Sequence, residues 1–371
     1  MPRPIYLDYN ATAPVRPAVI AAMVETMTAV GNPSSVHGFG RRARAAREGA
    51  REQVAALVGA RPAQVVFTSG GTEANNLALT GVDRARVLVS AIEHDSVLKA
   101  TAVETVPVLR AGVVNLVELA ELLEQDRRPA IVSVMLANNE TGVIQPLADV
   151  VGIARAQGAL VHCDAVQAVG KIDVDFAALG VDLMTLSAHK FGGPPGVGAL
   201  VVGEHVTLAP RQRGGGQERG RRAGTENLPA IVGFGVAAQT AQTGLDAAAG
   251  LVRRRDDLEA RITAAAPDAI IFGREAPRLP NTTCVALPGL SSELQVMALD
   301  LAGVAVSAGS ACSSGKVQAS HVLRAMGVDA VTAASAIRVS LGWQTEAADI
   351  DRFLEAWSML AARSRRRVDA A

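Results

Sequence analysis

The segment Ser187-Ala188-His189-Lys190 places a lysine between an apolar run and a glycine-rich turn. The apolar run, residues 181–186, is typical of a buried strand. Burial favours the neutral amine, and a neutral lysine can form a Schiff base with a carbonyl compound. Of the four lysines in the chain, only Lys190 follows a strand directly and opens such a turn. A lysine in an ordinary surface turn fits the same short pattern, so the rest of the chain must decide.

Cys312 is the second candidate for chemistry, because its neighbours from Gly309 to Gly315 are all small. Core cysteines normally sit among bulky apolar residues, so we expect Cys312 to be exposed and nucleophilic. Cys163 and Cys284 lie in apolar runs and are expected to be buried and inert. Three cysteines provide neither a disulfide framework nor a metal-ligand spacing. We therefore expect a reducing compartment and no metal site.

Other motifs fit a phosphate-bearing cofactor with an aromatic ring. Gly71 and Thr72 stand between a strand and a helix, where amides and a hydroxyl can bind phosphate, although such residues are common in turns. Asp164 ends a buried strand and can either cap a helix or pair with the pyridine nitrogen of pyridoxal phosphate. His94 can stack on a ring and transfer protons, or it can be a structural residue.

The elements that would position these residues form an alternating pattern of apolar strands and helices between residues 65 and 202. This pattern predicts an α/β fold with a mostly parallel sheet of about seven strands flanked by helices. Polar clusters follow five of the expected strands, at residues 69–72, 93–94, 138–140, 164–167 and 187–190. Ligands bind at the carboxyl ends of such strands, so the five clusters favour one shared site.

Length and composition allow two domains with sizeable cores, because the chain has 371 residues and 49% of them are apolar. We expect a large cofactor-binding domain at residues 15–250. A smaller α+β domain would combine residues 1–14 with residues 251–371 and carry the loop of Cys312. Its expected strands lie near residues 269–272, 282–287 and 337–341.

The charge balance gives no sign of a nucleic-acid or anionic membrane partner, because Lys plus Arg and Asp plus Glu both number 36. No segment approaches the roughly 20 apolar residues of a membrane span, and the N-terminus lacks an apolar signal core. We therefore expect a cytoplasmic protein.

Stretches spread in order over nearly the whole chain resemble those of cysteine desulfurases, fold-type I pyridoxal-phosphate enzymes of the class V aminotransferase superfamily. They are residues 6–12, 32–37, 68–76, 138–142, 162–167, 187–190, 214–227 and 310–315. The resemblance implies pyridoxal 5'-phosphate as the cofactor and L-cysteine as the substrate. It also implies a homodimer and a sulfur-acceptor protein, either a scaffold or a carrier, that uses the sulfur for iron–sulfur clusters or other sulfur-containing cofactors.

The resemblance also implies a role for individual residues. Lys190 would hold the cofactor covalently, His94 would stack on its ring and move protons, and Cys312 would receive the sulfur as a persulfide while L-alanine is released. Asn139 and Arg338 would bind the substrate carboxylate, which arginine can pair with through two hydrogen bonds. The other expected cofactor ligands are Gly71, Thr72, Ser187 and His189 at the phosphate, Asp164 at the pyridine nitrogen, Gln167 at the ring oxygen, and Thr225 reaching the phosphate of the other subunit.

Two other kinds of function remain open at this point. One is a selenocysteine lyase or an aminotransferase of the same fold, and an aminotransferase has no use for a nucleophilic Cys312. The other is a non-catalytic sulfur-carrier or assembly protein that kept the fold. The presence of Lys190, Asp164 and His94 together counts against that second alternative.

Overall fold

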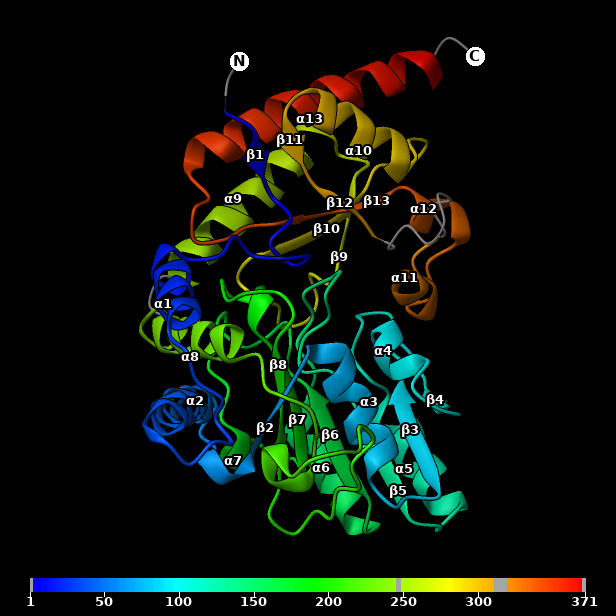
Figure 1. Cartoon of the computed structure of the whole chain (residues 1–371). Coiled ribbons are helices and arrows are strands. Elements are labelled where there is room, and N and C mark those ends of the chain that lie inside the picture. The colour runs from blue at the N-terminus through cyan, green and yellow to red at the C-terminus, as the bar shows by residue number, and fades with distance from the viewer. Residues whose placement is uncertain (1–2, 245–247, 310–318, 369–371) are drawn as a thin grey trace.

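A computed structural model describes residues 3–244, 248–309 and 319–368 of the chain. Figure 1 shows one layer of structure built around a large sheet and a second, smaller layer stacked on one end of it. The large sheet has seven strands in the order β2-β8-β7-β6-β5-β3-β4. Its strands are β2 (Val65–Thr68), β3 (Arg86–Ser90), β4 (Glu104–Val106), β5 (Ala130–Ser133), β6 (Leu160–Asp164), β7 (Leu183–Ser187) and β8 (Gly198–Val202).

Most neighbouring strands of this sheet run parallel, from β4 through β3, β5 and β6 to β7. Only β8 runs against its neighbours, and it is antiparallel to both β7 and β2. The predicted fold class, an α/β fold with a mostly parallel sheet of about seven strands, is therefore confirmed.

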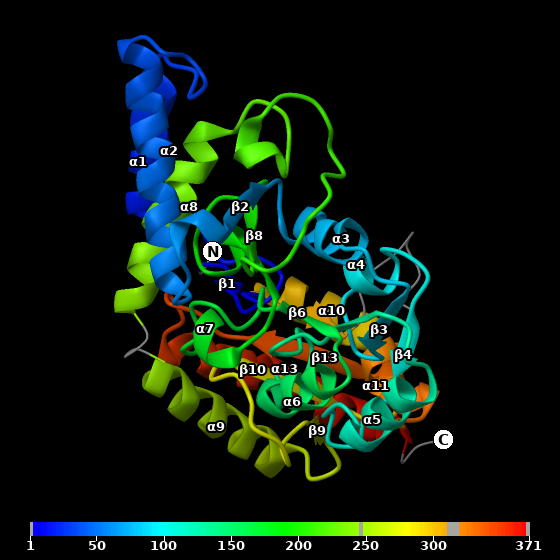
Figure 2. The ribbon, with the colours of Figure 1, turned by 90° about the horizontal axis from the view of Figure 1, so that it is seen from below.

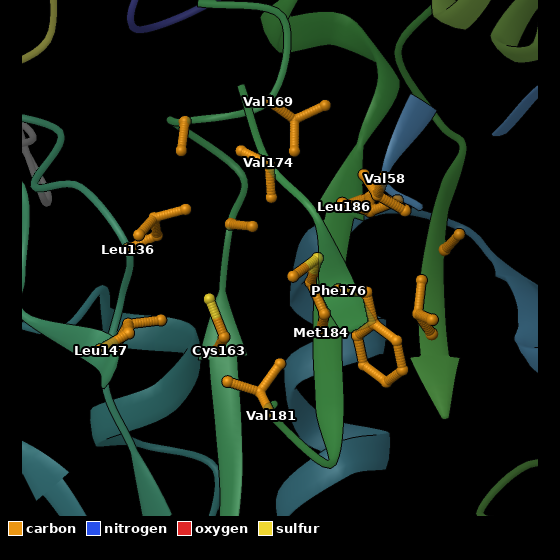
Figure 3. Packing of buried hydrophobic residues seen from close by; sticks show 14 of the residues in the cluster. Val58, Leu136, Leu147, Cys163, Val169, Val174, Phe176, Val181, Met184 and Leu186 are labelled. Atoms are coloured by element: carbon orange, nitrogen blue, oxygen red, sulfur yellow. The ribbon is translucent and has the colours of Figure 1, made fainter. Parts of the chain in front are cut away.

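Helices cover both faces of the large sheet, because its strands are apolar on both sides. Val66 packs with α3 on one face, while its neighbours Val65 and Phe67 belong to the cluster on the other face, as the two-residue period of a strand requires. Figure 3 shows part of this second cluster, with the Cys163 sulfur among apolar side chains. The helices of this layer are α1 (Pro17–Thr28), α2 (Gly38–Leu57), α3 (Gly71–Gly81), α4 (Asp95–Leu98), α5 (Leu116–Gln125), α6 (Leu147–Ala156), α7 (Phe176–Leu179) and α8 (Leu228–Thr243), with short 3-10 turns η1 (Pro62–Gln64), η2 (Ala188–Lys190) and η3 (Gln217–Gly220).

The smaller layer contains an antiparallel sheet in the order β12-β13-β10-β9 and a parallel pair of β1 with β11. The three strands expected from sequence occur as β9, β10 and β13. Its elements are β1 (Ile5–Tyr6), α9 (Ala248–Ala265), β9 (Ile270–Phe272), β10 (Thr282–Ala286), α10 (Ser292–Leu301), β11 (Val304–Ala305), β12 (Ser307–Ala308), α11 (His321–Ala325), α12 (Ala330–Ala334), β13 (Ala336–Ser340) and α13 (Ala347–Val368).

The first residues of the chain belong to the core of the smaller layer. Ile5 and Leu7 are buried in the same apolar cluster as Trp357 of α13. The chain then continues through Asn10 toward the carboxyl end of β7, where Ala13 N donates to the carbonyl oxygen of His189. The N-terminal segment thus passes between the two layers. None of the described helices is long and apolar enough to cross a membrane.

Candidate active site

A cavity of about 240 Å³ lies where the strands of the large sheet end. Each of the five polar clusters predicted from sequence contributes to its wall, so the prediction of one shared location is matched by the fold. The lining residues are Gly71, Thr72, Asn75, His94, Ser96, Met135, Ala137, Asn139, Asp164, Val166, Gln167, Ser187, His189 and Lys190.

Lys190 lies in η2, the turn that follows β7 directly. Its Nζ donates hydrogen bonds to the carbonyl oxygens of Asn10 over 2.7 Å and Ala11 over 2.9 Å. Burial is the main cause that lowers the pKa of Lys190 to about 8, and the charge of Arg338 lowers it further. An amine with this pKa has a much larger neutral fraction near physiological pH than an ordinary lysine, so it can act as a nucleophile or a base.

Asp164 ends β6, and both of its carboxylate oxygens accept hydrogen bonds. Oδ1 accepts from Val166 N over 3.0 Å, and Oδ2 accepts from Asn75 Nδ2 over 2.8 Å. The same Asn75 nitrogen donates to Ser96 Oγ over 2.9 Å, and Ser96 Oγ lies 2.8 Å from His94 Nδ1. A line of hydrogen bonds therefore joins Asp164 to His94 along one wall of the cavity.

His94 is the N-cap of α4, and its Nδ1 accepts a hydrogen bond from the backbone N–H of Ser96. With Nδ1 used in this way, Nε2 is the ring nitrogen left to carry a hydrogen. The preceding residue, Glu93, is fully buried and accepts a hydrogen bond from Met135 N over 2.7 Å. Burial first, and then the charge of Asp164, raise the pKa of Glu93 well above its ordinary value. Burial of Glu93 therefore favours the neutral form of its carboxyl group.

Another part of the site is suited to an anion. Gly71 and Thr72 begin the eleven-residue helix α3, where backbone amides carry partial positive charge. A Cβ atom added at Gly71 would stand 3.1 Å from Val166 Cγ2, so a side chain there would crowd the cavity wall. Ser187 and His189 line the same cavity. Burial and the nearby Lys190 lower the pKa of His189 to about 4, which leaves its ring neutral.

Asn139 lines the cavity. Arg338 contacts Asn139 but is not part of the cavity wall. Arg338 donates one hydrogen bond to Asp8 Oδ1 over 2.7 Å and another to the Asn139 carbonyl oxygen over 3.1 Å. Its Nε is buried and meets no partner among the described residues. The assignment of Asn139 and Arg338 to a substrate carboxylate stays a prediction.

Like Arg338, the predicted residue Thr225 does not line this cavity. Thr225 is exposed on the long connection between β8 and α8, which Figure 2 shows as the green loop projecting from the body of the molecule. Cys312 lies outside the described residues. Cys163 and Cys284 are fully buried, as expected, and burial raises the pKa of both thiols.

Several residues of the site were not singled out from the sequence. Asn10 and Asn75 lie in stretches that carry the family resemblance, and membership of those stretches is the sequence signal that could have identified them. Asn10 meets both Lys190 and the side chain of Lys171. Ser96 and Met135 carry no local signal, because a serine in a first helical turn and a methionine after a strand are common.

Comparison with known proteins agrees with this geometry. The model of the family described as aminotransferase class-V matches residues 5–353. The IscS-like cysteine desulfurase of Mycobacterium tuberculosis is 42% identical, over 99% of this chain and 98% of that protein. A cysteine desulfurase of Cereibacter sphaeroides is 44% identical, over 95% of this chain and 94% of its own. Among solved structures, a NifS-like protein from Rickettsia africae has a TM-score of 0.91 at 36% identity and covers 96% of this chain and 99% of its own.

Proposed function

We infer the function of this chain from the family to which it belongs, the class-V aminotransferases, and propose that it is a cysteine desulfurase. It takes sulfur from L-cysteine and releases L-alanine. The observation that carries this proposal is the position of Lys190, an amine with a pKa of about 8 in a cavity that is also lined by the Asp164 side chain and by a helix N-terminus suited to an anion.

The residues of the cavity fit pyridoxal 5'-phosphate, the cofactor that the family implies. A helix N-terminus stands beside Ser187 and His189, and the space in front of Gly71 would be crowded by any side chain. Asp164, with both oxygens already fixed by hydrogen bonds, would hold the pyridine nitrogen. The ligands would be Gly71, Thr72, Ser187 and His189 for the phosphate, Gln167 for the ring oxygen, and Lys190 for the covalent link. When bound, this cofactor supplies an electron sink for negative charge at the substrate α-carbon.

The residues of the chain itself then have separate roles in the reaction. Lys190 takes and returns the proton at the substrate α-carbon, for which a pKa of about 8 is well suited. His94 presents its Nε2 hydrogen to the cavity and moves a second proton. Asn139 and Arg338 orient the substrate carboxylate.

Sulfur leaves by attack of the Cys312 thiolate on the substrate sulfur. A new S–S bond forms as the carbon–sulfur bond breaks. The electron pair of the broken bond stays with the carbon, which takes up a proton and becomes the methyl group of alanine. The sulfur is then held as a persulfide on Cys312 and passes to an acceptor protein for iron–sulfur cluster or other cofactor synthesis. The enzyme works as a homodimer in which Thr225 completes the phosphate site of the partner.

The direct test is to incubate the purified protein with L-cysteine and a reductant, and to measure alanine and sulfide. Equal amounts of the two products are expected. Transfer of the amino group, with a keto acid as product and no sulfide, would instead assign the chain to the aminotransferases.

A further inference from the structure

Lys171 is a second buried lysine near the cavity, and the proposed function does not use it. It lies in the segment that follows β6, which begins directly after Asp164 and also carries Gln167. The segment is packed tightly. Gly170 has a φ of +78°, and a Cβ added there would come within 2.7 Å of Phe191 Cβ. The backbone that carries Lys171 is therefore held in place.

The amine of Lys171 meets two amide oxygens and no carboxylate among the residues that the structure describes. Its Nζ donates to Asn10 Oδ1 over 2.8 Å and to Gln167 Oε1 over 2.7 Å. Burial first, and then the charges of Lys190 and Arg338, lower its pKa well below the ordinary value. Each of these two oxygens accepts a hydrogen bond from the amine.

This contact decides which way the Gln167 amide faces. The oxygen and nitrogen of a glutamine amide have nearly the same shape, so their orientation follows from their hydrogen-bond partners. In this arrangement Lys171 donates to Oε1, so Oε1 faces the lysine and Nε2 turns the other way. One hydrogen of Nε2 goes to the Asn10 carbonyl oxygen over 2.9 Å. The other hydrogen is left for a ligand in the cavity that Gln167 lines.

We propose that Lys171 is a positioning residue that holds the Gln167 amide with its N–H toward the cavity, and thereby selects a cofactor with a ring oxygen at that point. The inference rests on the proposed function, because the ring oxygen is that of pyridoxal 5'-phosphate. Without Lys171, Gln167 can rotate and present Oε1, which repels an oxygen anion.

The effect on Lys190 is expected to be smaller. Lys171 also donates a hydrogen bond to the side chain of Asn10. The backbone carbonyl oxygen of the same residue accepts a hydrogen bond from Lys190. That side chain has other partners, since Asn10 Nδ2 donates to Thr282 Oγ1 over 2.9 Å and its Oδ1 accepts from Asn281 Nδ2 over 3.1 Å. Loss of Lys171 therefore leaves Asn10 anchored, whereas Gln167 Oε1 loses the only partner it has within the described part of the chain.

The test measures binding of two ligands to the apoprotein of each variant. One ligand is pyridoxal 5'-phosphate, and the other is an analogue with hydrogen in place of the ring hydroxyl. Lys171→Met keeps length and apolar volume but removes the N–H donors. We expect it to reduce the preference for the natural cofactor over the analogue by roughly tenfold, the range of a hydrogen bond to a charged group. Lys99→Met is the matched control, because Lys99 is exposed and its amine bonds only Asp95 among the residues that the structure describes, and it should leave the preference unchanged.

A role limited to packing predicts a different result, in which Lys171→Met weakens both ligands equally, and that result overturns the inference. An unchanged preference overturns it as well.

A second variant, Gln167→Met, should lose the same preference, and adding Lys171→Met to it should cause no further loss. If Lys171→Met does not fold, Lys171→Gln, which keeps two N–H donors, should retain part of the preference, and complete loss there counts against the inference. Wild-type apoprotein that binds neither ligand would refute the proposed function instead.

Discussion

The amine of Lys190 donates a 2.7 Å hydrogen bond to the carbonyl oxygen of Asn10, a residue 180 positions earlier in the chain. Asn10 belongs to the segment that connects the core of the smaller layer to the site. A carbonyl oxygen cannot neutralise an ammonium charge as a carboxylate would. The bond therefore orients the amine without cancelling the burial that lowers its pKa.

Replacing this amine should abolish the chemistry of the site. In Lys190→Ala we expect no covalent, borohydride-reducible attachment of pyridoxal 5'-phosphate and a loss of sulfide release of at least about 100-fold, the usual contribution of a catalytic base. Mass spectrometry after borohydride treatment measures the attachment. Lys99→Ala should behave as wild type, and a reducible adduct at wild-type yield in Lys190→Ala would contradict the assignment.

The pKa of Lys190 predicts how cofactor uptake depends on pH. Only the neutral amine attacks an aldehyde, and its pKa is lowered to about 8. Below that pH the neutral fraction falls about tenfold per unit, so the uptake rate should rise as the pH increases from about 6 and level off above about 8. His189 does not titrate in this window, because its pKa is about 4. A stopped-flow trace of apoprotein with the cofactor gives the rate, and a flat profile would show that amine ionisation does not limit uptake.

Cys312→Ser should separate cofactor binding from sulfur transfer. The variant is expected to keep the cofactor colour and bind cysteine, but to form no protein persulfide and to release sulfide at least about 100-fold more slowly, because a hydroxyl is a far weaker nucleophile. Cys163→Ser and Cys284→Ser are the matched controls, since both thiols are fully buried with raised pKa values. Persulfide on either of these cysteines in the Cys312 variant, with normal sulfide release, would reject the role of Cys312.

Thr225 should act on the phosphate site of the other subunit. Thr225→Ala is expected to weaken cofactor binding by roughly tenfold, as for a lost hydrogen bond to a charged group. Mixed dimers of Lys190→Ala and Thr225→Ala subunits give the sharper test. If Thr225 acts on the partner, one site of the mixed dimer has both residues intact and binds the cofactor as in wild type. If Thr225 acts within its own subunit, no intact site exists, and wild-type affinity will be absent.

The loop that carries Thr225 is fastened to its own subunit by a buried ion pair. Arg51 donates two hydrogen bonds to the Glu218 carboxylate over 2.7 and 2.8 Å, and Phe67 N donates a third over 2.9 Å. Glu218→Ala leaves the buried Arg51 with only the more exposed Glu48 as a charge partner among the described residues, so we expect a loss toward the lower end of about 3–5 kcal/mol in the free energy of unfolding.

The exposed pair of Arg261 and Asp351 provides the comparison for that loss. Breaking it with Asp351→Ala should change the free energy of unfolding far less than Glu218→Ala does, because both charges of the exposed pair stay in water. Urea denaturation of both variants measures the difference, and equal losses would mean that burial of the Glu218 pair adds nothing.

The sequence by itself determined the large sheet and the place of the site. Alternation of apolar strands with helices requires a parallel sheet, and polar residues after buried strands must collect at the carboxyl edge of that sheet. For that reason Lys190, Asp164 and His94 could be assigned to one cavity from local patterns. Burial of Cys163 and Cys284 follows equally from the apolar strands that hold them.

Only the tertiary structure decided which groups hold these residues in place. Lys171 meets Asn10 across 161 positions, and Arg338 meets Asp8 across 330. Neither contact leaves a periodic pattern in the sequence, because each joins segments that are far apart in the chain and approach only in the folded protein. The lowered pKa values of Lys190 and Lys171 depend on tertiary packing as well. Burial and charges that are distant in the sequence set the stability of a buried ammonium group, whereas its neighbours in the chain do not.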